Sequence, residues 1–94
     1  MTIRSFTDKA TEVFFATGRC PSQWQGFWSS AVRKLHMIDY AVSLTDLNSP
    51  SGERLEALKG NRKGQHSIRI NDQWRVCFVW TADGPENVEI VDYH

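Results

Sequence analysis

The chain has 94 residues, and its eleven Lys and Arg residues balance eleven Asp and Glu residues to a formal net charge of zero. This length predicts a single domain spanning 1–94, and the 40% apolar and 23% charged residues exclude a disordered chain. No run of about 18 apolar residues predicts a membrane span, and the N-terminal residues lack the apolar stretch of a secretory signal, so we expect a cytoplasmic protein. A neutral total also argues, at first sight, against a nucleic-acid partner.

The beginning of the chain predicts a short strand followed by a helix. Residues 2–6 have the composition of a strand. Asp8 is a residue type that caps helix N-termini, and Gly18 suits the left-handed conformation that often follows a last helical turn. A helix is therefore expected over about 8–17.

A second, longer helix is predicted over about 22–42. Ser22 and Gln25 fit the capping box, in which two side chains satisfy backbone N–H groups at a helix start. Apolar residues then follow at helical spacing. We interpret the two tryptophans of this stripe, Trp24 and Trp28, as core residues in preference to a ligand site.

The second half of the chain alternates apolar and polar residues, which predicts strands. Residues 43–54 predict a loop with one helical turn at 44–47. The order of elements predicts an α+β fold, a small antiparallel sheet with two helices on one face. The expected strands are 54–58, 66–70, 74–80 and 87–93, joined by a basic loop at 59–64 and turns at 71–73 and 83–85.

The two cysteines, Cys20 and Cys77, are too few for a disulfide framework and have no second ligand at the spacing of a zinc site. Two thiols are expected, and a bridge between them is the less favoured alternative. Cys77 lies within an apolar run and is interpreted as a small buried residue. We expect no metal and no cofactor.

The register of the predicted hairpin follows from its loop. A three-residue loop at 71–73 puts the large apolar side chains on one face, with Ile68 opposite Val76. The other face then carries Arg69 directly across from Arg75. A two-residue loop would mix the faces and is rejected.

The last strand extends both faces of this sheet. Val88 and Ile90 should join the apolar face, which puts Glu89 and Val91 on the arginine side together with Tyr93. If Ile90 lies beside Phe78, Tyr93 falls beside Arg75.

Two arginines that face each other across strands repel one another. Either an anion such as phosphate lies between them, or each finds a carboxylate such as Glu56 or Glu89; the sequence leaves both alternatives open. The local charge favours a polyanion partner, because residues 54–75 carry +4 and the rest of the chain −4. The six basic residues of this block are Arg54, Lys59, Arg62, Lys63, Arg69 and Arg75.

Two segments of the chain resemble a known family. They read R-L-E-A-L-K-G-N-R-K-G-Q-H-S-I-R-I-N-D-Q-W-R-V-C-F and V-E-I-V-D-Y-H. They resemble the HigB killer proteins, the toxin half of bacterial HigB–HigA pairs, and the GraT-like members in particular. The resemblance implies a RelE/ParE-like microdomain, a ribosome-dependent endoribonuclease that cuts mRNA, and a HigA-like helix-turn-helix antitoxin that binds operator DNA together with the toxin.

The resemblance also implies roles for individual residues. Lys59 matches a lysine of the family's L-K-G loop, Arg75 matches the arginine of its W-R strand, and the last three residues match its terminal D-Y-H. In RNA cleavage by the 2′-OH group, Arg75, Lys59 and Arg69 would stabilise the phosphorane, and His94 would transfer protons. Tyr93 would stack on a base and Asp92 would orient His94. The expected phosphate contacts are Arg54, Arg62, Lys63 and Arg69.

One residue departs from the family pattern. Many members have a histidine in R-L-H-P-L-K-G where this chain has Glu56. A glutamate can accept the 2′-OH proton, but it also neutralises part of the basic cluster. Two alternatives stay open: a ParE-like inhibitor of DNA gyrase, because that class shares the fold, and a non-catalytic protein that binds RNA or the ribosome, in which Glu56 has replaced a needed catalytic group.

Overall fold

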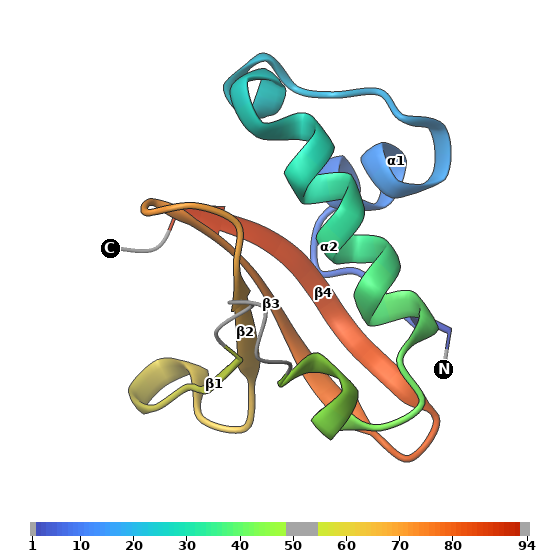
Figure 1. The fold of residues 1–94 in the computed structure, drawn as a ribbon, viewed down its shortest axis with the longest axis vertical. Coiled ribbons are helices and arrows are strands. Elements are labelled where there is room, and N and C mark those ends of the chain that lie inside the picture. Colours follow the sequence, from blue (N-terminus) through green and yellow to red (C-terminus); the bar gives the residue numbers. More distant parts are fainter. Residues whose placement is uncertain (1, 49–54, 93–94) are drawn as a thin grey trace.

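The computed structural model describes residues 2–48 and 55–92 and has the predicted α+β arrangement. Four antiparallel strands form one sheet in the order β1-β2-β3-β4. They are β1 (Glu56–Ala57), β2 (His66–Arg69), β3 (Trp74–Thr81) and β4 (Gly84–Asp92). The helices are α1 (Lys9–Thr17) and α2 (Trp28–Tyr40), with 3-10 turns η1 (Ser22–Phe27), η2 (Leu44–Leu47) and η3 (Gly60–Arg62). Figure 1 shows the helices beside β3 and β4, with β1 and the loop after it at the other end of the sheet.

Helix α1 confirms the prediction for 8–17. The Asp8 carboxylate accepts the backbone N–H of Thr11 at 3.2 Å and so caps the first turn. At the other end Gly18 has a φ of 81°, and its N–H donates to the carbonyl of Phe14 at 2.9 Å. This left-handed conformation is one that glycine adopts without steric cost.

The predicted strand at 2–6 is not a strand of the sheet but an extended segment against β4. Phe6 forms a single parallel bridge with Val88. The N–H of Arg4 donates to the carbonyl of Pro85 at 2.7 Å, and the N–H of Ile3 donates to the Asp39 carboxylate of α2 at 2.9 Å. The N-terminal segment thus joins the outer edge of β4 to α2.

The predicted continuous helix over 22–42 is wrong at both ends. Residues Ser22–Phe27 form a 3-10 turn, whose N-cap position is Pro21 and not Ser22 and has no side-chain capping hydrogen bond. Phe27 then leaves helical geometry, with φ −137° and ψ 21°, directly after Gly26, a poor helix former. At the far end the Asp46 carboxylate accepts the N–H groups of Val42 and Ser43, which ends the helical path after Tyr40. These two hydrogen bonds hold the pKa of Asp46 below its ordinary value.

The 3-10 turn also separates the two tryptophans. Trp24 is 2% exposed and packs edge-on against Phe14, with ring centroids 5.5 Å apart, whereas Trp28 is 55% exposed. Residues four apart share a face at 3.6 residues per turn but diverge at three per turn. The core prediction is therefore right for Trp24 and wrong for Trp28.

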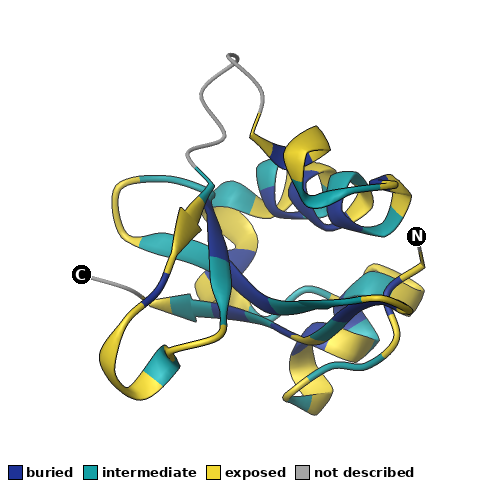
Figure 2. Ribbon diagram, turned by 90° about the horizontal axis from the view of Figure 1, so that it is seen from below, coloured by how far each residue is buried: buried dark blue, intermediate teal, exposed yellow. Residues whose placement is uncertain are grey.

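The core lies between the helices and one face of the sheet, and Figure 2 shows buried residues along the strands and on the inner sides of the helices. Alternate strand residues supply the sheet side of this core, as the period-2 pattern predicts. No helix within residues 2–48 and 55–92 is both long and apolar enough to cross a membrane. The helices contribute Phe14, Trp24, Ala31, Leu35 and Ile38, and the strands contribute Ile68, Val76, Phe78, Val88 and Ile90.

The predicted hairpin register is confirmed. Ile68 lies opposite Val76, and Arg69 lies opposite Arg75. The N–H of Ile70 donates to the carbonyl of Trp74 at 2.9 Å and so closes the three-residue loop. The apolar and polar faces of β2 and β3 are therefore separated as the alternation requires.

The pairing of β4 differs from the prediction. The turn before it is shorter than 83–85, because Gly84 and Pro85 already pair with β3. A register shift follows, near Asn87, whose φ of 54° is left-handed. As a result Ile90 lies beside Val76 and not beside Phe78, and Val91 lies opposite Arg75. Tyr93, whose placement beside Arg75 depended on the other pairing, lies outside the described residues.

Candidate functional site

The sheet face opposite the core carries a set of polar side chains, which we call the polar face. One row crosses all four strands, because Glu56 pairs with Ser67, Ser67 with Cys77, and Cys77 with Glu89. The neighbouring row holds Arg69, Arg75 and Val91. The prediction that Glu89 and Val91 share the arginine side is confirmed. The polar face therefore comprises Glu56, Ser67, Arg69, Arg75, Cys77 and Glu89.

Arg75 is the most central cation of this face. Its Nη2 lies 2.9 Å from the Oε1 of Glu56, and its Nη1 donates to the Oγ of Ser67 at 3.1 Å. The Arg75 side chain is 17% exposed and the Glu56 side chain is 50% exposed. Of the two alternatives for the arginine pair, the structure has the carboxylate partner for Arg75.

Arg69 turns away from Arg75 toward the hairpin loop. Its Nε donates to the backbone carbonyl of Asn71 at 3.1 Å, and its Nη2 pairs with the Asp72 carboxylate. The two arginines are directly opposite in register, yet each is bound to a different acid. Their mutual repulsion is therefore relieved within the chain.

The basic loop at 59–64 is tied to the sheet by Arg62. Its Nη1 donates to the Oε1 of Glu89 in β4 at 2.8 Å and to the Oε1 of Gln65 at 3.1 Å. The N–H of Leu58 donates to the carbonyl of Gln65 at 2.9 Å, which closes the loop at its base. Sequence reasoning placed Glu89 on this side but missed it as the partner of Arg62, since long-range pairing of two charged residues leaves no local pattern.

The net positive charge around the polar face is lower than the +4 that the sequence gives for residues 54–75. In the described part of the 54–75 block there are five cations, and the carboxylates of Glu56, Asp72 and Glu89 pair with three of them. Glu89 lies beyond the block in sequence but inside the region in space. Lys59 and Lys63 are exposed, and neither makes an ion pair with another described residue. The unbalanced positive charge of the described region is therefore carried by the two loop lysines.

Cys77 lies beneath these charges. It is fully buried, and burial raises the pKa of its thiol to about 11. Both cysteine thiols are free. Because the thiolate is the reactive form of cysteine, Cys77 is a poor nucleophile near neutral pH. No three His, Cys, Asp or Glu side chains in ranges 2–48 and 55–92 lie close enough together to hold a metal ion.

The remaining predicted site residues lie at or beyond the edge of the described structure. Asp92 is exposed at the end of β4, and its Oδ2 accepts a hydrogen bond from the Gln73 amide at 3.0 Å. It pairs with Trp74 and so points to the other side of the strand from Arg75. Arg54, Tyr93 and His94 lie outside the described residues.

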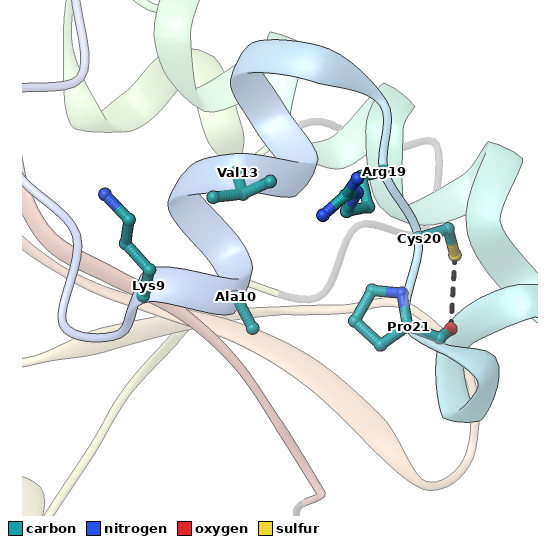
Figure 3. A pocket seen from close by; sticks show the side chains of 6 residues that line it. All are labelled: Lys9, Ala10, Val13, Arg19, Cys20 and Pro21. Atoms are coloured by element: carbon teal, nitrogen blue, oxygen red, sulfur yellow. Dashed lines mark hydrogen bonds between the residues drawn. The ribbon is translucent and has the colours of Figure 1, made fainter.

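The helical layer contains a hollow that is separate from the polar face. A hollow of about 410 Å³ lies between α1 and the segment that follows it, and Figure 3 shows the side chains lining it. Two cations, Lys9 and Arg19, line this hollow, together with Ala10, Val13, Cys20 and Pro21. Both cations are exposed and come from outside the polar face. Substitutions of Lys9 and Arg19 therefore serve as matched controls for substitutions of cations on the polar face.

Comparison with known proteins shows which family the chain belongs to. A family described as the RelE-like toxin of the type II toxin–antitoxin system HigB matches residues 4–94. The chain belongs to the HigB-like toxin family. It is accordingly the toxin of a type II toxin–antitoxin system and has an antitoxin as its partner.

Three individual proteins are similar to this chain, and two of them carry the HigB name. Toxin HigB-1 of Vibrio cholerae is 38% identical, over 95% of this chain and 94% of its own length. A protein named Endoribonuclease HigB, from Proteus vulgaris, is 28% identical over 98% and 99% of the two chains. An uncharacterised protein of Haemophilus influenzae is 34% identical over 60% of this chain and 55% of its own.

Proposed function

We propose that this HigB-like toxin is a ribosome-dependent endoribonuclease that cleaves mRNA. The observation that carries the proposal is the placement of Arg75, recessed on the polar face and bonded on two sides. An oriented guanidinium is well suited to bind a phosphate through two hydrogen bonds. The Proteus vulgaris relative, named Endoribonuclease HigB, supports the same reaction.

The proposed chemistry uses the RNA itself as nucleophile. The 2′-OH loses a proton and attacks the adjacent phosphorus, a bond forms to the 2′ oxygen, and the 5′ oxygen leaves with a proton. The negative charge on the phosphorane is greatest during this step. Arg75 would stabilise that charge, with Lys59 and Arg69 adding positive potential.

Proton transfer is assigned to the predicted acid–base residues. Glu56 would accept the 2′-OH proton, and His94 would donate a proton to the leaving oxygen. Asp92 would orient His94, and Tyr93 would stack on a base of the message. The roles of Asp92, Tyr93 and His94 come from the family resemblance and the D-Y-H ending. Glu56 stands where many family members have a histidine, so its role is assigned from the chemistry of its carboxylate.

The partners follow from the same proposal. We infer a HigA-like helix-turn-helix antitoxin, through which the toxin would associate with operator DNA. We also infer the ribosome with bound mRNA as the presenting surface, which places the protein in the cytoplasm. Arg54, Arg62 and Lys63 are proposed to contact phosphates, and no cofactor is assigned.

Programmed ribosomes provide the direct test. The purified toxin should cut mRNA bound to ribosomes and should leave DNA supercoiling by gyrase unchanged. Deletion of His94 should lower the cleavage rate about 10²-fold, as expected for loss of a general acid. A folded His94-deleted toxin with full activity would contradict the assigned acid, and gyrase inhibition without cleavage would support the ParE-like alternative.

A non-catalytic translation inhibitor is the second candidate. The ion pair between Glu56 and Arg75 favours it, because it engages the cation that cleavage needs. In that case the parent chain would block translation without cutting mRNA, and Glu56→His would introduce cleavage. Cleavage by the parent chain excludes this candidate.

The loop lysines should determine the salt dependence of ribosome binding. Lys59→Ala and Lys63→Ala each remove one exposed charge, so each should reduce the slope of log K against log salt by about 0.7. Binding is measured between 50 and 300 mM salt, by the binding of labelled toxin to ribosomes. Lys9→Ala in the helical layer is the control and should leave the slope unchanged. Equal slopes for all three variants would contradict phosphate contact by the loop.

A further inference from the structure

The Glu56 carboxylate is positioned on Arg75 as an anionic ligand would be. Its Oε1 lies 2.9 Å from Nη2, a distance typical of a charge-assisted hydrogen bond. Half of the Glu56 side chain is exposed, whereas the Arg75 side chain is largely covered. The Glu56 carboxylate is therefore a solvent-accessible anion that an incoming phosphate would compete with for Arg75.

Glu56 can leave Arg75 more easily than Glu89 can leave Arg62. Glu89 is 17% exposed and belongs to the nine-residue strand β4. Glu56 belongs to the two-residue edge strand β1 and already reaches water. A Glu56 carboxylate that is displaced from Arg75 would be solvated, so it would not become a buried, unpaired charge.

Ser67 gives Arg75 a second contact that does not depend on Glu56. Its Oγ is fully buried in β2 and accepts a hydrogen bond from Nη1, on the other arm of the guanidinium. The guanidinium therefore keeps this contact at one arm while the other exchanges partners. The charge of Arg75 stays paired during the exchange, because one anion replaces another on the guanidinium.

We propose that Glu56 occupies the place of an RNA phosphate on Arg75, and that the scissile phosphate binds by displacing it. The proposal rests on the proposed ribonuclease function and adds a competing internal anion to that site. A dilute RNA competes poorly with a carboxylate that is already attached to the chain. A phosphate held in place by the ribosome has a high effective concentration and competes well. Glu56 thus makes cleavage depend on presentation of the substrate.

Phosphate binding to the isolated toxin tests the displacement directly. Inorganic phosphate is titrated into the parent chain and the Glu56→Gln variant, and the Arg75 side-chain resonance is followed by nitrogen NMR. The variant should bind phosphate about fivefold more tightly at Arg75, the factor that corresponds to loss of an exposed ion pair of about 1 kcal/mol. Phosphate affinity equal to or weaker than that of the parent overturns the proposal.

Glu12→Gln is the matched control. Glu12 lies on α1, its side chain is 53% exposed, close to the 50% of Glu56, and it makes an ion pair with Lys9 at 3.6 Å. The Glu12→Gln substitution removes one negative charge, as Glu56→Gln does, but lies outside the polar face. Phosphate affinity should therefore stay within about twofold of that of the parent chain. An equal gain in both variants would assign the effect to net charge and overturn the proposal. Because this titration requires no cleavage, it stays decisive even if the toxin proves not to be a ribonuclease.

Binding to the ribosome provides the second measurement. Ribosomes carry an mRNA with a 2′-deoxy nucleotide at the cleavage position, so that the complex forms without reaction. Glu56→Gln should bind this complex more tightly than the parent, and Glu56→Gln combined with Arg75→Ala should lose the gain. A gain that persists without Arg75 would show that Glu56 acts elsewhere.

Discussion

Replacement of Arg75 by alanine should lower mRNA cleavage on programmed ribosomes by about 10³-fold. The expected loss is of the size seen when an enzyme loses a preorganised group that stabilises transition-state charge. In this structure Arg75 is held by the buried hydroxyl of Ser67, a contact that remains when a phosphate replaces Glu56, so its position does not have to be established during the reaction. The measurement is a single-turnover cleavage rate at saturating toxin.

Two further variants separate charge from geometry. Arg75→Lys keeps the charge but loses the planar fork, so most of the activity should still be lost. Arg19→Ala, in the helical layer, should retain the parent rate. Thermal unfolding of each variant confirms that the fold is intact. An Arg75→Ala variant that is folded and fully active would remove Arg75 from the mechanism.

Replacement of Trp24 by alanine should destabilise the fold by about 4 kcal/mol. Trp24 is fully surrounded by the core and contacts Phe14 edge-on, so the change removes a large buried ring and leaves a cavity. A loss of this size is a large part of the total stability of a small domain. Urea unfolding followed by circular dichroism gives the free energy of unfolding.

Trp28→Ala is the matched variant four residues away. More than half of Trp28 is exposed, so the same substitution should change the free energy of unfolding by less than about 1 kcal/mol. Equal losses in the two variants would contradict the burial difference created by the 3-10 turn. Retained cleavage by Trp28→Ala would also show that the ring is not part of the active site.

The sheet and its two faces were predictable because they depend on local alternation. The position of Arg69 opposite Arg75 followed from one loop length and the requirement that apolar side chains share a face. The ends of α1 followed from Asp8 and Gly18, whose capping chemistry is local. The second helix was less predictable, because the spacing of apolar residues continues across Gly26 and so does not reveal the change from the 3-10 turn to the α-helix at Phe27.

The candidate site was predictable in its members but not in its pairs. Sequence reasoning brought Arg75, Arg69 and Glu56 to one region, yet it could not choose the acid for each arginine. Those choices depend on side-chain geometry across strands, as does the Arg62 contact with Glu89. The error in the β4 register has a backbone cause, since the shorter turn and the shift near Asn87 have no clear pattern in the sequence.

The N-terminal segment has a consequence for the colloidal behaviour of the protein. An outer strand normally exposes a row of unpaired N–H and C=O groups to which another chain can add. Here Arg4, Ser5 and Thr7 exchange backbone hydrogen bonds with β4, so part of that row is already used. Truncation before residue 7 would expose these groups on β4 to intermolecular strand addition. Protein prepared for crystallisation or assay should therefore keep these residues and carry any tag before them.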